Sequence, residues 1–149
     1  MDSSGSMEDS RQKLEDASKD IAKAIGNLTS DFRLGFGSYN DKPTFPFSKE
    51  IDSYTKDRKN PPYAFKHEMN LTTDTEEFKK AVKDLKLINN VDSPESGLDA
   101  IAQALLCDGQ DGQENIANWR NGGVQKVIIV ITDQEMHYAG LITISNRLQ

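Results

Sequence analysis

The N-terminal residues carry oxygen atoms in a pattern suited to a metal ion. Asp2, Ser4 and Ser6 occupy alternate positions of a turn that leads into a helix, so a carboxylate and two hydroxyls can converge on one point. Ligand sets made only of oxygen suit hard cations such as Mg²⁺ or Ca²⁺. The alternative is that these side chains cap the first helix, a common use of Ser and Asp.

Oxygen-bearing residues also gather at two later places in the chain. Asp133 lies just after an apolar run that stops at Thr132-Asp133, where a strand is predicted to end. A second group precedes a predicted helix and consists of Asn90, Asp92, Pro94 and Glu95. Ligands in open α/β sheets bind where strands end, so both groups are candidates for the same site.

The two histidines are a weaker metal signal. Neither His67 nor His137 has a second nitrogen or thiolate ligand nearby in the sequence. Because such ligands normally act in groups, we predict that both are exposed loop histidines.

The first half of the chain predicts one helix and two strands. Apolar residues at helical spacing predict a helix over residues 7–25, with Gly26 as its end. Alternating apolar residues predict a strand over residues 32–36, and a short second strand follows over residues 45–47. Residues 48–70 have no sustained period and predict a long exposed loop.

A second helix follows that loop. Its capping box is formed by Thr73 with Glu76 or by Asp74 with Glu77. Apolar residues at helical spacing continue from Phe78, and they predict an end near residues 89–90.

A third helix and a buried strand complete the predicted elements. Asp92 or Ser93 caps the third helix, with Pro94 at its first position. Residues 108–123 are polar and glycine-rich and predict a loop. The β-branched run over residues 127–131 is typical of a strand buried on both faces. This order predicts a doubly wound α/β sheet, and the turn at residues 2–6 predicts a first strand that precedes it and is missing from the chain.

Length and charge narrow the classes of function. The chain has 149 residues, one domain's worth, and 18 basic against 24 acidic residues give a net charge of −6. This charge argues against nucleic acid as a partner. No apolar run approaches the roughly 20 residues that span a bilayer, and no secretion signal is recognisable. Cys107 is the single cysteine, so no disulfide forms within the chain.

Five segments resemble the I-like domain of integrin beta subunits, which is of the von Willebrand factor A type and Rossmann-like in fold. They stand in the family's order and at similar spacing: Asp2-x-Ser4-x-Ser6, residues 35–43 (GFGSYNDKP), residues 92–101 (DSPESGLDAI), Trp119-Arg120-Asn121, and Thr132-Asp133 with residues 137–140 (HYAG). The resemblance implies an incomplete domain over residues 1–140, without its first central strand and C-terminal part, and a divergent tail over residues 141–149. It also implies that Cys107 matches a cysteine whose partner lies beyond this chain; the alternative is a small buried hydrophobe.

The same resemblance implies three linked metal sites. The metal-ion-dependent adhesion site takes Mg²⁺ or Mn²⁺, and its matching residues are Asp2, Ser4, Ser6, Glu95 and Asp133. The synergistic site takes Ca²⁺, and its matching residues are Asp41, Asn90, Asp92, Pro94 through its carbonyl, and Glu95. The adjacent third site uses two consecutive acids in the family; here Asp9 matches, and Ser10 occupies the second position.

By the same resemblance, the chain is expected to be a binding module and not an enzyme. It implies a cell-adhesion receptor at the cell surface, on the extracellular side of a single-pass membrane protein, paired with an integrin alpha subunit. Its partner is an acidic extracellular protein ligand that binds through the cation. The sequons at Asn27 and Asn70 fit glycosylation of such a domain.

Three alternatives remain open at the level of sequence. The first is that the chain is a non-functional truncated fragment, since losing a central strand removes much of a core. The second is that it is a generic metal-binding von Willebrand factor A domain with another interaction role. Clustered Asp residues also occur in metal-dependent phosphohydrolases. That class finds little support, because no base, acid or phosphate-holding lysine stands at matching positions.

Overall fold

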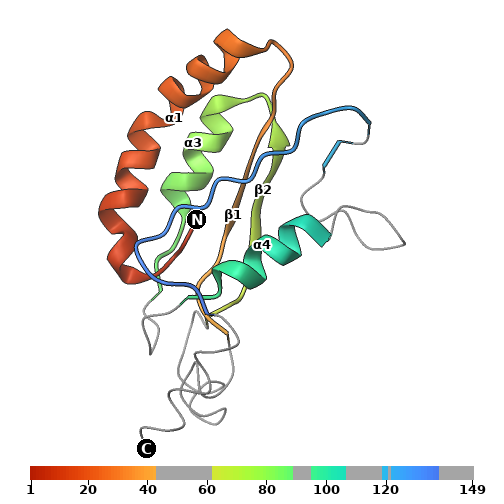
Figure 1. Ribbon diagram of the computed structural model, residues 1–149. Helices are drawn as coiled ribbons and strands as arrows, with labels where there is room; N and C mark the ends of the chain where they lie inside the picture. The colour runs from red at the N-terminus through yellow and green to blue at the C-terminus, as the bar shows by residue number, and fades with distance from the viewer. Residues whose placement is uncertain (43–61, 89–94, 107–118, 121, 138–149) are drawn as a thin grey trace, which may run out of the picture.

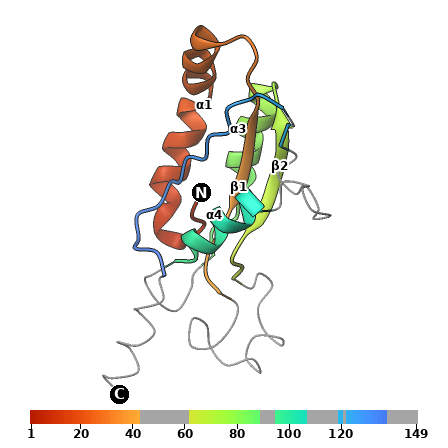
Figure 2. The ribbon, with the colours of Figure 1, turned by 45° about the vertical axis from the view of Figure 1, so that its right-hand side comes forward.

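The computed structural model describes residues 1–42, 62–88, 95–106, 119–120 and 122–137. In chain order these residues form a 3-10 turn η1 (Gly5–Met7), α1 (Glu8–Leu28), β1 (Leu34–Ser38), β2 (Lys66–Thr72), α3 (Thr75–Asp84) and α4 (Gly97–Leu106). Helix α3 contacts α1 and both strands. Figures 1 and 2 show α1 and α3 side by side, with α4 near the end of β1.

The first predicted helix is confirmed, but its predicted end is wrong. Helix α1 continues through Gly26 to Leu28, and the Thr29 backbone N–H still donates to the Ile25 carbonyl at 3.0 Å. A glycine inside a helix costs only about 1 kcal/mol, which is too little to end one whose other hydrogen bonds persist. The predicted strand over residues 32–36 is also confirmed, as β1, two residues further along.

Strand β2 corrects the prediction of a loop over residues 48–70. Residues 66–70 belong to this strand, which pairs antiparallel with β1 so that Phe36 stands opposite Met69. Both side chains are buried. Local sequence missed the strand because its stability comes from this pairing with a partner some thirty residues away. The remainder of the predicted loop through residue 61, and the strand predicted over residues 45–47, lie outside the described residues.

Helix α3 confirms the second predicted helix and settles its cap. The Asp74 carboxylate accepts hydrogen bonds from the backbone N–H groups of Glu76 at 2.8 Å and Glu77 at 3.2 Å. The helix ends at Asp84, and the predicted end near residues 89–90 is wrong. Beyond it the chain runs extended, and the Ile88 backbone N–H donates to the Ser3 carbonyl at 2.8 Å.

The start predicted for the third helix is wrong as well. Helix α4 begins at Gly97, because the preceding Glu95 pairs through its backbone with residues 135–137 and is extended. Its proposed caps Asp92 and Ser93, together with Pro94 and Cys107, lie outside the described residues.

The β-branched run over residues 127–131 is not the buried strand that its composition predicts. It forms no regular strand, and the Val127 and Ile129 side chains are 61% and 72% exposed. β-branched residues favour an extended backbone, but burial requires neighbours on both faces. Within the described chain, Ile131 packs against the core.

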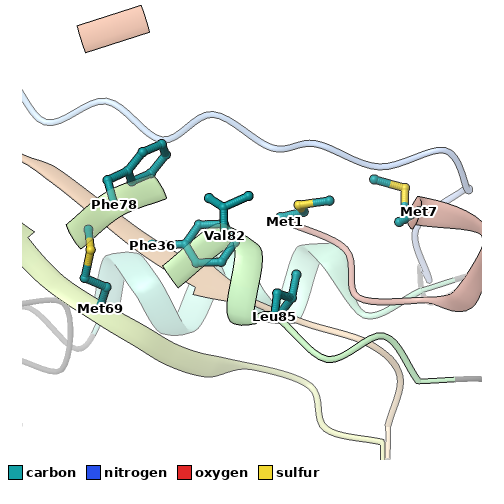
Figure 3. Close-up of a cluster of buried hydrophobic side chains, with 7 residues drawn as sticks. All are labelled: Met1, Met7, Phe36, Met69, Phe78, Val82 and Leu85. Atoms are coloured by element: carbon teal, nitrogen blue, oxygen red, sulfur yellow. The ribbon is translucent and has the colours of Figure 1, made fainter. Parts of the chain in front are cut away.

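The hydrophobic core joins β1, β2 and α3 to the N-terminus. Its buried side chains are drawn in Figure 3: Met1, Met7, Phe36, Met69, Phe78, Val82 and Leu85. The rings of Phe36 and Phe78 meet edge to face, with centroids 6.0 Å apart. This core anchors the N-terminal turn, because residues on both sides of it, Met1 and Met7, belong to the cluster.

Candidate functional site

The N-terminal segment pairs with residues 39 and 131, in addition to its bond with Ile88. The Tyr39 backbone N–H donates to the Met1 carbonyl at 3.1 Å, and the Ser3 N–H donates to the Tyr39 carbonyl at 2.7 Å. The Asp2 N–H donates to the Ile131 carbonyl at 2.9 Å. The bridge between Asp2 and Tyr39 is parallel, so the two segments end on the same side. The turn that follows therefore lies where these segments meet.

The serine hydroxyls of this turn reach one another and a distant carboxylate. Ser4 Oγ lies 3.1 Å from Ser6 Oγ, and Ser6 Oγ donates to Asp133 Oδ1 at 3.1 Å. Ser4 makes no side-chain cap bond to the helical turn that it precedes. The sequence left two interpretations of these hydroxyls, metal binding and helix capping. The observed contacts do not support helix capping.

Asp2 is fully buried beside these hydroxyls and has donors on both carboxylate oxygens. Oδ1 accepts from the Ser4 backbone N–H at 2.7 Å, and Oδ2 accepts from Thr132 Oγ1 at 3.0 Å. A buried carboxylate without donors is costly, so these bonds fix its position. Thr132 was not singled out for this role from sequence, although it stands in the Thr132-Asp133 pair.

Glu95 approaches the same region from the start of α4. Its side chain is buried. Its backbone N–H donates to the Glu135 carbonyl at 2.8 Å, and its carbonyl accepts from the His137 N–H at 2.9 Å. Residues 135–137 follow closely on Asp133, with Gln134 between them, so these two hydrogen bonds bring Glu95 toward the adhesion-site residues.

The phenol of Tyr39 is subject to the combined charge of this region. Its pKa is raised to about 12. Burial is the largest cause, and the carboxylates of Asp2, Glu95 and Asp133 contribute smaller increases. Negative charge disfavours an ionised phenol nearby. Three carboxylates of the predicted adhesion site thus act on one buried group.

Asp41 forms a second buried centre next to the first. Its side chain is 0% exposed, and Oδ1 accepts from the Lys42 backbone N–H at 2.6 Å. His137 Nε2 lies 2.9 Å from the same oxygen, and Ser96 Oγ lies 3.4 Å from it. Of the other residues of the predicted synergistic site, Glu95 is described, and Asn90, Asp92 and Pro94 lie outside the described residues.

The prediction of two exposed loop histidines is wrong for both, since His137 is buried and His67 is a half-buried strand residue. The His137 side chain is 7% exposed and contacts Asp41. His67 is a residue of β2, and its Nε2 lies 2.9 Å from Asn70 Oδ1. No local pattern reveals the burial of His137, since it comes from segments about 40 and 95 residues earlier; its place in the matched HYAG segment was the available signal.

Asp9 and the two sequon asparagines lie apart from these centres. Asp9 is exposed in the first turn of α1, where an acid suits the helix dipole. In the described part of the chain, no hydrogen bond or ion pair joins Asp9 to the adhesion-site residues. Asn27 is exposed near the end of α1, and Asn70 is exposed in β2.

The oxygen atoms around the N-terminal turn suit a hard cation if the serine and threonine hydroxyls are counted together with the carboxylates. Across the described ranges, no three His, Cys, Asp or Glu side chains gather closely enough to form a metal site by themselves. The short contacts here run through Ser4, Ser6 and Thr132, which such a grouping leaves out. Neutral hydroxyls and carboxylate oxygens are the donors that Mg²⁺ and Ca²⁺ take.

None of the helices described is long and apolar enough to cross a membrane.

The chain matches the sequence model of the family described as "Integrin beta chain VWA domain" over residues 1–146. Integrin beta pat-3 of Caenorhabditis elegans is 40% identical over 147 residues, which are 94% of this chain and 17% of that protein. Integrin beta-6 of Rattus norvegicus is 37% identical, and that of Homo sapiens 36% identical, each over 145 residues, or 93% of this chain and 18% of the relative. The chain therefore spans less than a fifth of the length of these relatives.

The family match confirms the predicted α/β fold class. Within the described residues the sheet has two antiparallel strands, and parallel pairing is found in single bridges at residues 2, 4 and 95. The division of the chain at residue 140 stays a prediction.

Proposed function

This chain belongs to the integrin beta family as a VWA domain of the beta chain, and we propose that it is a cell-adhesion module that binds acidic extracellular ligands through a divalent cation. The observation that carries the proposal is the chain of contacts from Ser4 to Ser6 to Asp133, each 3.1 Å long, beside the buried carboxylate of Asp2.

The proposed adhesion site holds Mg²⁺ or Mn²⁺ with Asp2, Ser4, Ser6, Glu95 and Asp133. Two of these residues offer neutral hydroxyls, and a carboxylate that stands outside direct contact with the ion orients the other ligands. The ligands in direct contact then leave part of the cation's charge unneutralised. A carboxylate of the ligand is then strongly attracted to an open coordination position. The module recognises its ligand by coordination to the cation and makes or breaks no covalent bond in it, so it is not an enzyme.

The proposed synergistic site holds Ca²⁺ with Asp41, Asn90, Asp92, the Pro94 carbonyl and Glu95. Support comes from the buried Asp41 carboxylate and from Glu95, whose backbone is tied to the segment that follows Asp133. Glu95 belongs to both proposed ligand sets. Asp9 is the remaining candidate ligand of the adjacent site.

The whole protein is proposed to pair this beta chain with an integrin alpha subunit at the cell surface. The module then lies on the extracellular side of a single-pass membrane protein. The exposed side chains of Asn27 and Asn70 are proposed to carry glycans there.

Calorimetric titration with Mg²⁺ and Mn²⁺ tests the adhesion site. We expect D133A to weaken binding by more than the roughly 10- to 100-fold that losing an outer-shell partner causes. The matched control is D20A, which removes an exposed acid from α1 and is expected to leave cation affinity unchanged.

Ligand binding is tested with an acidic peptide and the same proteins. We expect binding in Mg²⁺ that is abolished by EDTA and by D133A, and retained by D20A. Equal cation affinity in both variants would contradict the proposal. A chain that binds no cation and has the circular dichroism of an unfolded protein would favour the truncated-fragment alternative.

A further inference from the structure

We propose that His137 is a positioning residue that orients the Asp41 carboxylate for a cation. The inference rests on the proposed function, because it concerns the synergistic site. The juxtaposition that carries it is an imidazole and a carboxylate 2.9 Å apart, both almost wholly removed from solvent.

The direction of this hydrogen bond follows from the chemistry of the two groups. An ionised carboxylate only accepts hydrogen bonds, so the proton lies on His137 Nε2, which donates to Asp41 Oδ1. Among the contacts of the described residues, that oxygen also accepts from the backbone N–H of the adjacent Lys42 at 2.6 Å and from Ser96 Oγ at 3.4 Å. His137 therefore supplies the shortest side-chain hydrogen bond among these three, and it comes from a distant segment.

The backbone of His137 is held independently of its side chain. Its N–H donates to the Glu95 carbonyl at 2.9 Å, and the Glu95 N–H donates to the Glu135 carbonyl at 2.8 Å. The segment also fits closely against the start of α4, where a Cβ added to Gly97 would stand 2.8 Å from Met136 Cγ. A substitution of the imidazole thus removes the bond to Asp41 and leaves the path of the chain in place.

This separation gives the proposal a specific consequence. Hydrogen bonds from outer-shell partners hold carboxylate ligands in their binding orientation, and losing one typically lowers metal affinity about 10- to 100-fold. The loss should fall on the Asp41 site. The adhesion site keeps its own contacts, from Ser6 to Asp133 and from Thr132 to Asp2.

The variants H137L and H137Q test the role of the imidazole. Leucine fills space without a donor, whereas glutamine places an amide N–H near the position of Nε2. The matched control is H67L, because His67 makes a contact of the same length, 2.9 Å, to Asn70 in β2. Cation binding is measured by calorimetric titration with Ca²⁺ and Mg²⁺. The binding transition lost in D41N is assigned to the Asp41 site, and the one lost in D133A is assigned to the adhesion site.

We expect H137L to weaken the transition assigned through D41N by about 10- to 100-fold and the transition assigned through D133A by less than about threefold. H137Q restores most of the lost affinity, and H67L resembles the wild type. A merely structural role would weaken both transitions together and would not be rescued by glutamine, which would overturn the inference.

A second measurement applies if H137L does not fold. In the wild type, the imidazole ¹⁵N signals of His137 shift along with the Ca²⁺ transition of the Asp41 site, and those of His67 do not. An unchanged His137 signal would overturn the inference while cation binding itself persists. A wild-type chain that binds no cation at all overturns the proposed function and this inference with it.

Discussion

Single hydrogen bonds decide which oxygens of this chain can act together. Asp2 carries a charge in a fully buried position, and the Ser4 backbone N–H and Thr132 Oγ1 each donate to one of its carboxylate oxygens. Thr132 also accepts from the Gln134 backbone N–H at 3.2 Å, so its hydroxyl links Asp2 to the turn that carries Asp133. The side chains of the proposed adhesion site are thus positioned by a residue that is not among its predicted ligands.

Replacing Thr132 by valine tests this link, because valine has the same shape without the hydroxyl. A hydrogen bond to a charged group is worth about 1.5–3 kcal/mol, and we expect T132V to lower the free energy of unfolding by that amount. Urea unfolding followed by circular dichroism measures it.

The control for T132V is T73V, since Thr73 is exposed. A surface change of this kind is expected to alter stability by no more than about 0.5 kcal/mol. Equal effects of the two substitutions would mean that the Thr132 hydroxyl contributes nothing to holding Asp2.

At the scale of elements, helix α3 connects the core to the site. Phe78 and Val82 bury one face of the helix in the core, and the chain beyond its end at Asp84 runs back to pair Ile88 with Ser3. The start of the helix is fixed by Asp74. Because one end is capped by a side chain and the other leads into the N-terminal turn, the position of α3 constrains that turn.

Removal of the Asp74 cap is expected to destabilise the domain. In D74A the backbone N–H groups of Glu76 and Glu77 lose their acceptor, which typically costs about 1 kcal/mol. The unfolding midpoint in urea should fall without a change of slope, since the surface exposed on unfolding is the same.

Asparagine offers the matched comparison at that position, because D74N retains a good capping oxygen. We expect D74N to recover most of the stability. If D74A and D74N are equally unstable, the charge of Asp74 near the helix N-terminus matters more than its hydrogen bonds.

At the scale of the whole molecule, the acidic excess and the site belong together. The net charge is −6, and the carboxylates of Asp2, Asp41 and Glu95 are all buried. Like charges in one region disfavour the folded state, and a bound cation is the largest local charge that can offset them. The folded state should therefore bind cations better than the unfolded chain does.

Millimolar Mg²⁺ and Ca²⁺ are accordingly expected to raise the melting temperature. A cation at about 100 times its dissociation constant stabilises the folded state by about 2.7 kcal/mol. For a domain of this size that corresponds to roughly 5–10 °C, measured by thermal unfolding with and without EDTA.

Sodium chloride at equal ionic strength separates specific binding from general screening of surface charge. We expect NaCl to give only a small part of the shift, and a variant with both D41N and D133A to lose the cation-specific part. A shift of the same size in NaCl would argue against bound cations as its cause.

The sequence by itself determined the local features of this protein. Helices α1 and α3 follow from apolar spacing, a helix start at Thr73 or Asp74 follows from residue type, and the oxygen donors at positions 2, 4, 6 and 133 follow from motif spacing. These features depend on interactions within a few residues, or on residue types whose chemistry is the same in any fold. The matched segments added the family, which composition and periodicity do not reveal.

Only the tertiary structure decided what each segment packs against. It exposed Val127 and Ile129, paired residues 66–70 with β1, and buried His137 against Asp41. Burial and pairing depend on neighbours that are tens of residues away in the chain, and a local pattern carries no record of them. The same property that hid His137 from sequence reasoning, contact with distant segments, is what allows it to act on the proposed cation site.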